Sequence, residues 1–123
     1  MTHWNDADLA KVGAAEELDL ESERADGTLR DPVTMWVVRS GGHVYVRSVK
    51  GTAGPWYRGV RSRLRGRVAA GGVRRDVTFR PADPGEYAAV DAAYRKKYGR
   101  YTSIVEHVLT DRARASTLRL EPR

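Results

Sequence analysis

The sequence predicts an α+β fold, in which six short strands form a small antiparallel barrel, closed or split, with peripheral helices. Short stretches alternate apolar and polar residues, as half-buried strands do. Glycine turns join several of these stretches into hairpins. With 123 residues the chain has the size of one domain, and it has no second full set of strands from which to build a sandwich. We therefore expect residues 1–123 to form a single barrel domain.

Alternation and turn residues predict the elements in order. The six expected strands cover residues 17–23, 33–39, 44–49, 67–70, 73–80 and 117–121. The run 33–39 is almost continuously apolar, which predicts burial on both of its faces. Expected helices cover residues 5–12, 56–64 and 83–98, and a further helix begins at Ser103. Capping residues place three of these helix starts, with Asn5 as one cap and capping boxes expected at Asp83–Glu86 and Ser103–Glu106.

Composition narrows the class of protein. The chain has no cysteine, which excludes disulfides, thiolate catalysis and cysteine-ligated metals. No apolar run approaches the length of a membrane span, and the first residues lack the pattern of a signal peptide. We therefore expect a cytoplasmic protein with no membrane partner.

The net charge is +6 and is unevenly distributed. Acidic residues dominate positions 1–31, whereas positions 47–80 hold ten cations and one acid. A basic middle segment suggests an anionic partner, either a nucleic acid or a small phosphorylated molecule. The alternative is that the excess of arginine has no functional meaning. Nucleic acid is the less favoured partner, because aromatic residues are not interleaved with the arginines and no known module signature is present.

Residues 43–58 carry the clearest indication of a binding site. A strand with alternating apolar positions runs into four residues suited to phosphate, namely Arg47, Ser48, Lys50 and Gly51. A glycine-containing bend follows, and Pro55 then opens a helix. Helix N-termini offer free N–H groups, and basic side chains pair with phosphate oxygens. The alternative is a strand end that is merely basic.

Other kinds of site find little support. The three histidines, His3, His43 and His107, show no spacing typical of metal ligands, so no metal site is expected. No Ser-His-Asp or paired-carboxylate arrangement points to hydrolysis. The glycine pairs at 41–42 and 71–72 fit turns and do not form a nucleotide-binding fingerprint.

Several motifs together resemble a known family. They are Arg24-x-x-Gly27-x-x-Arg30, the segment Tyr45-Val-Arg-Ser-Val-Lys50-Gly51 and the helix start Pro55-Trp56-Tyr57. This pattern is similar to the deazaflavin-dependent nitroreductases of the flavin-binding split-barrel superfamily. Nearly the whole chain, including Ala93–Tyr98 and the tail from Thr117, resembles more closely the DUF2255 family of uncharacterised actinobacterial proteins.

The resemblance implies a six-stranded split barrel, a homodimer and a flavin cofactor, either FMN or the deazaflavin F420. It implies that Arg24, Arg30, Ser48, Lys50 and Gly51 contact the cofactor's phosphate and sugar-alcohol tail. Trp56 and Tyr57 would pack beside this tail. Tyr94 and Tyr98 would lie near the ring, although their helical spacing by itself favours a place in the core.

The sequence departs from the nitroreductase pattern at two places. Ala25 and Asp26 replace a lysine and a serine at the arginine turn, and Gly59-Val60 replaces Asn-Leu after the Trp-Tyr pair. Two hypotheses therefore stand beside each other. The first is an oxidoreductase that transfers a hydride between the cofactor and a small substrate. The second is a cofactor-free split barrel that binds another small anionic ligand.

Overall fold

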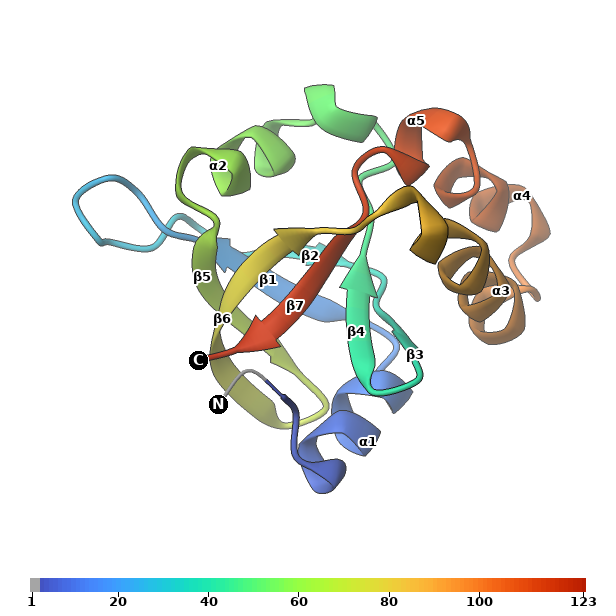
Figure 1. Ribbon diagram of the computed structural model, residues 1–123, viewed down its shortest axis with the longest axis horizontal. Helices are drawn as coiled ribbons and strands as arrows, with labels where there is room; N and C mark the ends of the chain where they lie inside the picture. Colours follow the sequence, from blue (N-terminus) through green and yellow to red (C-terminus); the bar gives the residue numbers. More distant parts are fainter. Residues whose placement is uncertain (1–2) are drawn as a thin grey trace.

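The computed structural model describes residues 3–123, which form an antiparallel half-barrel of seven strands with five helices around it (Figure 1). The strands are β1 (Leu18–Ser22), β2 (Val33–Met35), β3 (Val38–Ser40), β4 (His43–Val46), β5 (Arg65–Ala70), β6 (Val73–Pro81) and β7 (Leu118–Pro122). The helices are α1 (Asp6–Ala14), α2 (Pro55–Arg63), α3 (Tyr87–Tyr98), α4 (Thr102–Val105) and α5 (Asp111–Arg114). Three 3₁₀ helices, η1 (Gly51–Ala53), η2 (Pro84–Glu86) and η3 (Glu106–Val108), complete the chain. The α+β prediction is confirmed.

The predicted count of six strands is wrong, because the stretch 33–39 divides into two. The strand order is β2-β1-β5-β6-β7-β4-β3, so β2 and β3 lie at opposite edges of the sheet. Strand β2 pairs with β1, and β3 pairs with β4. Only residues 36–37 separate β2 from β3. At this seam the two edges of the half-barrel are therefore joined by the chain itself and not by a ladder of hydrogen bonds.

Helix α3 supplies the hydrogen bonds that the sheet lacks at this seam. The backbone N–H of Val37 donates to the Tyr98 hydroxyl (3.2 Å), and the Val37 carbonyl accepts from that hydroxyl (3.0 Å) and from Lys97 Nζ (2.6 Å). Val37 is fully buried, so unpaired polar groups there would be costly. The burial expected on both faces of 33–39 holds only for Val37 and Val38, since Val33, Thr34 and Arg39 are exposed.

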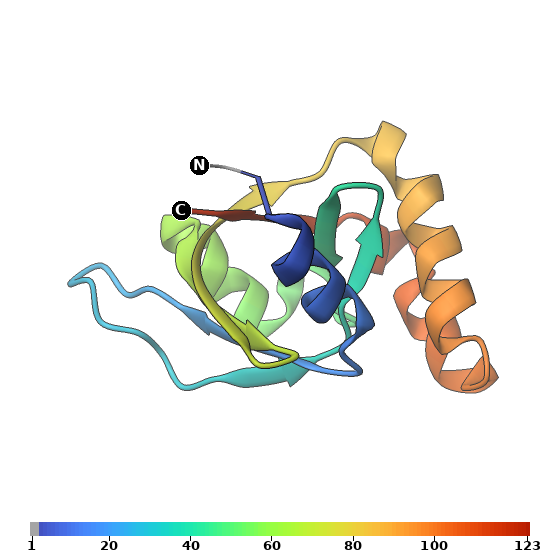
Figure 2. The same cartoon turned by 90° about the horizontal axis from the view of Figure 1, so that it is seen from below.

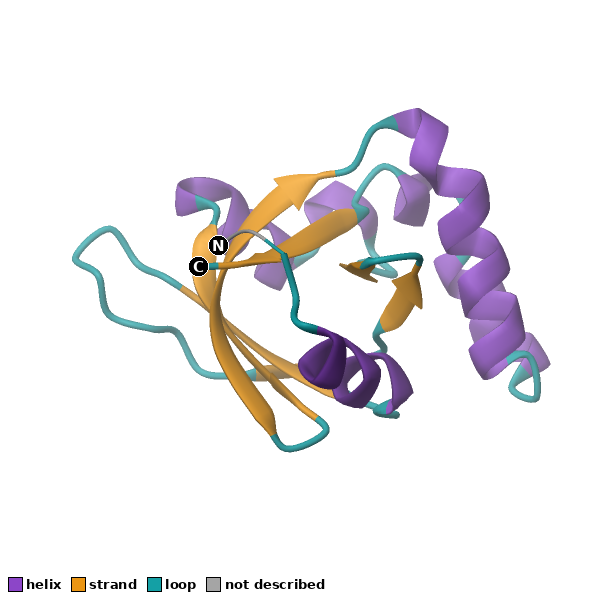
Figure 3. Ribbon diagram, turned by 60° about the horizontal axis from the view of Figure 1, so that its bottom comes forward, coloured by secondary structure: helices purple, strands orange, loops and turns teal. Residues whose placement is uncertain are grey.

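Two hydrophobic cores lie on the two faces of β3 and β4. Val44 and Val46 point into the barrel, where a core of side chains from the sheet, α1 and α2 is packed. Tyr45 points outward into a second core, formed with Val90, Tyr94 and Tyr98 of α3. Figures 2 and 3 show α3 outside the barrel, beside this short hairpin, with α1 on another side of the sheet. Both faces of β4 are therefore buried.

The predicted helix caps are only partly correct. Asn5 accepts a hydrogen bond from the Asp8 N–H (2.8 Å), and the Asp83–Glu86 capping box is present, so both of these predictions are confirmed. The capping box expected at Ser103–Glu106 is wrong, because α4 begins one residue earlier and Ser103 already lies inside its first turn. Within residues 3–123, none of the helices combines the length and the apolar character needed to cross a membrane.

Candidate functional site

Two adjoining hollows open on the side of the barrel where β2, the segment after β4 and α2 meet. The first has a volume of about 290 Å³ and is lined by Val33, Ser48, Val49, Lys50, Gly54, Pro55 and Trp56. The second has a volume of about 200 Å³ and is lined by Thr34, Met35, Trp36, Arg47, Val49, Trp56, Ile104 and Val108. Val49 and Trp56 belong to both linings, so the two hollows adjoin at these side chains, and together they are called the groove.

The groove gathers the large apolar side chains that the protein leaves exposed. Across residues 3–123 these are Val33 (37% exposed), Val49 (49%) and Ile104 (51%), which come from three separate segments. All three line the groove. Contiguous exposed apolar surface is typical of a binding site, whereas single exposed side chains are not informative.

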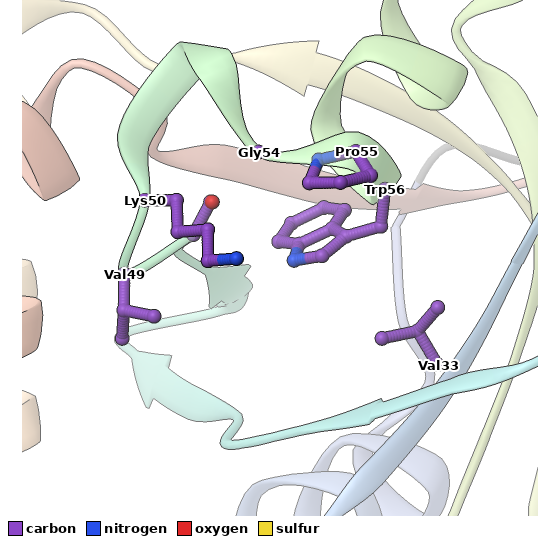
Figure 4. Close-up of a pocket in the computed structure, with 7 residues that line it drawn as sticks. Val33, Val49, Lys50, Gly54, Pro55 and Trp56 are labelled. Atoms are coloured by element: carbon purple, nitrogen blue, oxygen red, sulfur yellow. The ribbon is translucent and has the colours of Figure 1, made fainter.

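The start of α2 and Lys50 give one end of the groove its positive charge. Gly54 caps α2 without any side-chain hydrogen bond, and Pro55 occupies the first helical position. The next backbone N–H groups therefore have no side-chain cap, and the helix dipole adds partial positive charge there. Lys50 is exposed, and its side chain lies across the first hollow from Trp56 (Figure 4).

Two glycines hold this end in shape. Gly51 has φ +66°, a conformation that favours glycine, and a Cβ there would lie 2.7 Å from the Arg112 carbonyl oxygen. A Cβ at Gly54 would lie 2.5 Å from Ser48 Oγ. The turn η1 therefore packs closely against α5 on one side and against Ser48 on the other. Gly51 itself is buried and lines neither hollow, but it shapes the loop that presents Lys50.

Ser48 is buried and tied to the C-terminal part of the chain. Its backbone N–H donates to Ser116 Oγ (2.8 Å), and Ser116 Oγ donates to the Ser48 carbonyl (3.2 Å). Ser48 lines the first hollow even though only 2% of it is exposed. Sequence reasoning did not find Ser116, because nothing local to residue 116 indicates a partner 68 residues away.

Arg47 lies at the back of the groove, with a side chain that is 0% exposed. Its guanidinium donates to Asp91 Oδ1, to Thr117 Oγ1 (2.8 Å) and to the carbonyls of Val108 (2.9 Å) and Tyr87 (3.2 Å). These bonds join β4 to α3 and to the C-terminal segment. The guanidinium that we expected to face a phosphate is thus committed to the protein itself.

Asp91 is the buried acid that balances Arg47. Burial by itself would raise its pKa, but hydrogen bonds from Arg114 and Arg47 outweigh burial and hold the pKa below the ordinary value. Arg114 contributes through Nε (3.0 Å) and Nη2 (2.9 Å). Asp91 was missed, although an acid at 91 on the apolar stripe that contains Tyr94 and Tyr98 was a usable signal.

The arginines of the predicted turn lie outside the lining of the groove. Arg24 sits in the exposed hairpin loop after β1, where it donates to Thr28 Oγ1 (3.3 Å) and the Leu29 carbonyl (2.9 Å). Arg30 donates to the carbonyls of Glu23 (3.0 Å) and Gly59 (3.3 Å) and so fastens this loop to α2. The loop projects from the barrel in Figure 2.

The predicted ring-side tyrosines are in the second core. Tyr98 is fully buried, and its hydroxyl donates to the Glu16 carbonyl (2.7 Å) as well as bonding Val37. Burial raises the pKa of Tyr98 to about 12, so the phenol stays neutral. Tyr94 is also fully buried, and burial raises its pKa further. Trp36 stacks on Tyr98, with ring centroids 4.0 Å apart, and it is Trp36 that reaches the groove.

The Trp56-Tyr57 pair divides between the groove and the core. Trp56 is half-buried and lines both hollows. Tyr57 is buried among the apolar side chains inside the barrel, and its ring lies edge-on to Trp56 at 6.1 Å. Tyr57 therefore contacts Trp56 from the core side and lines neither hollow.

Comparison with known families now places the chain. The family described as "uncharacterized protein conserved in bacteria (DUF2255)" matches residues 8–120. The chain belongs to the DUF2255 family. A comparison with curated proteins finds no match.

Solved structures share the fold of this family member. An F420-H2 dependent reductase superposes with a TM-score of 0.66 at 21% identity, covering 86% of this chain and 94% of the other. A structure described as a domain-swapped dimer gives 0.66 at 20% identity, with coverages of 86% and 80%. An FAD-binding protein from Mesorhizobium loti gives 0.58 at 18% identity, with coverages of 97% and 88%. These superpositions establish a common fold. At identities this low, a common ligand does not follow.

Proposed function

We propose that this DUF2255 protein is a split-barrel flavin or deazaflavin protein, with F420 or FMN bound in the groove, and that it acts as an oxidoreductase on a small substrate. The observation that carries the proposal is the composition of the groove. One end of the first hollow combines Lys50 with the uncapped start of α2, and the rest of its lining is largely apolar and includes Val33, Val49 and Trp56. A positively charged end beside a flat apolar surface matches a phosphorylated tail followed by a flat ring system.

The phosphate end fits an anion for two independent reasons. Helix N-termini bind anions through free N–H groups and the helix dipole, and α2 has nine residues and no side-chain cap. Lys50 adds a full positive charge on a side chain that faces the same hollow (Figure 4). Arg24, Arg30 and Arg47 bond to the protein itself, so in this proposal none of them holds the phosphate.

The size and walls of the groove fit a ring system. The first hollow, at about 290 Å³, lies close to the lower end of the range typical of small-molecule sites. A bound flavin or deazaflavin would supply hydride transfer. The protein's part is to hold the tail with Lys50 and α2, to orient the ring against Trp56 and to keep water from it with apolar side chains.

We further propose that the protein is a homodimer. A solved structure with the same fold is described as a domain-swapped dimer, and the exposed Val33, Val49 and Ile104 would be partly covered in a dimer. Sedimentation velocity over a wide concentration range tests this directly. A monomer at every concentration would refute it.

The test of the cofactor is a fluorescence titration of the purified protein with FMN and with F420. We expect saturable quenching with one of them. Lys50→Ala should weaken that binding by about 10-fold or more, since a hydrogen bond to a charged group contributes roughly 1.5–3 kcal/mol. Lys96→Ala is the matched control, because Lys96 is equally exposed but lies on α3, away from the groove.

The outcomes separate the two hypotheses. Quenching that depends on Lys50 and not on Lys96 supports the proposal. Failure of both cofactors to bind at millimolar concentration would refute it and favour the cofactor-free barrel, for which phosphate or a phosphorylated sugar is the next ligand to titrate. Equal binding by both lysine variants would show that the tail lies elsewhere.

A further inference from the structure

The second hollow differs in chemistry from the first and has no role in holding a phosphate. It is bounded by Met35, Trp36 and Val108 together with the exposed Ile104, and it meets the first hollow at Val49 and Trp56. The groove therefore has a charged compartment and an apolar compartment that share one wall. This arrangement leaves room for two different molecules side by side.

No free charge faces this second hollow. Among its lining residues, Arg47 is the sole ionisable one, and its side chain is 0% exposed and paired with Asp91. The Thr34 hydroxyl also lines the hollow, but it donates to Asp19 Oδ1 (2.6 Å). An ion placed here would lose hydration and gain no counter-charge, which is strongly unfavourable. An uncharged molecule loses little by the same transfer.

The walls favour a flat molecule. Trp36 is fixed by its stack on Tyr98, at 4.0 Å between ring centroids and 5° between planes, and Tyr98 is itself locked by hydrogen bonds to the seam. The indole thus presents a rigid surface, against which a ring can stack. A volume of about 200 Å³ admits one or two fused rings, since an apolar cavity of about 150 Å³ binds benzene.

We infer that the second hollow binds the substrate, and that this substrate is an uncharged, flat molecule of one or two rings. The inference rests on the proposed function, because it assigns the first hollow to the cofactor. Trp36 and Ile104 are then the residues that select the substrate, the first by stacking and the second by covering the outer side of the ring.

The experiment compares two probes of the same shape and different charge. 2-Naphthol is neutral at pH 7, as phenols with a pKa of about 10 are, and 2-naphthoate is an anion. Binding is measured by calorimetry and by ligand-detected NMR, with and without saturating FMN or F420. We expect 2-naphthol to bind at least about 10-fold more tightly than 2-naphthoate, a difference of about 1.4 kcal/mol.

A substitution at Ile104 and a control outside the groove give a matched pair of variants. Ile104→Glu places a carboxylate at the second hollow and should weaken 2-naphthol binding by about 10-fold or more. Ala92→Glu places the same carboxylate on the exposed surface of α3, outside the lining of both hollows, and should leave 2-naphthol binding unchanged. Both positions are exposed, so neither variant should unfold the protein. Cofactor titration of each variant provides a reading that does not depend on the substrate site.

The possible results are distinguishable. Equal or tighter binding of 2-naphthoate, absence of binding by both probes, or insensitivity to Ile104→Glu would overturn the inference while leaving the cofactor proposal intact. Binding of 2-naphthol that depends on Ile104, in a protein that binds neither FMN nor F420, would refute the proposed function, and with it the assignment of this hollow to a co-substrate. Selective binding that depends on Ile104 and persists beside a bound cofactor is the expected result.

Discussion

Replacement of Asp91 by Asn should destabilise the protein strongly, because it removes the charge that balances Arg47. The Arg47 side chain is 0% exposed, and that of Asp91 is 9% exposed. Asn keeps the shape of the side chain and one acceptor oxygen but leaves the guanidinium without a counter-charge. The Arg114 contacts with Asp91 are weakened by the same change.

The expected loss is about 3–5 kcal/mol, the range found when one partner of a buried ion pair is removed. For a chain of this length such a loss lowers Tm by roughly 10–20 °C. The matched control is Asp76→Asn. Asp76 is also paired with an arginine, Arg67, at 2.8 Å, but it is 50% exposed, and exposed pairs contribute only about 0–1 kcal/mol.

Urea unfolding followed by circular dichroism at pH 7 gives the two free energies of unfolding. A loss for Asp91→Asn within 1 kcal/mol of that for Asp76→Asn would refute the reasoning.

The pH dependence provides a second check. The pKa of Asp91 is lowered in the folded state, so its stabilisation is present above the unfolded value of about 3.9 and is lost as the pH falls through the folded value. The gap between wild type and Asp91→Asn should therefore be constant near neutral pH and narrow in acid.

Three further predictions concern the seam and the η1 turn. Lys97→Met removes the donor shared by the carbonyls of residues 13, 15 and 37. Urea unfolding should show that the free energy of unfolding falls by about 2–4 kcal/mol, and a fall below 1 kcal/mol would contradict the prediction. Tyr98→Phe removes a hydroxyl buried at the same seam and should cost about 1–3 kcal/mol in the same assay, whereas an unchanged midpoint would show that the seam does not need it. Gly51→Ala should lower both stability and cofactor affinity, because a Cβ there would meet the Arg112 backbone. Gly72→Ala is the control: Gly72 has φ +84° and no neighbour within 4 Å of the added Cβ, so the change should lower stability alone. Equal effects of the two alanines on cofactor binding would refute the role of the η1 turn.

The positions of helix starts and hairpins were accessible from sequence because their causes are local. Asn5 and Asp83 bond to N–H groups three residues away, and Gly41 and Gly71 adopt positive φ inside their turns. Alternation placed Val44 and Val46 on one face of a strand. Each of these signals involves residues within a few positions of one another, so the sequence contains both partners of the interaction.

The site was predictable only in part. The stretch from Ser48 to Trp56 does line a hollow, and Lys50 does face it, as the residue types suggested. The linings at Trp36 and Ile104 come from other segments, and nothing in the sequence near residue 50 indicates that they are close. Arg47 was expected to face a phosphate, whereas its guanidinium is buried and bonds to Asp91 and to other groups of the protein.

Taken by itself, the amino-acid sequence determined an α+β protein with a basic central segment, a glycine-shaped loop and the cation Lys50 before a helix start. Only the tertiary structure decided how the two edges of the half-barrel are joined and which basic side chains remain available to a ligand. Strand 33–39 divides because its two halves find different partners at opposite edges of the sheet. The Arg47 guanidinium is occupied by hydrogen bonds within the protein, because α3 packs over the outer face of β4 and brings Asp91 to it, 44 residues along the chain. Contacts between distant segments depend on packing in three dimensions, and local patterns of residue type do not encode them.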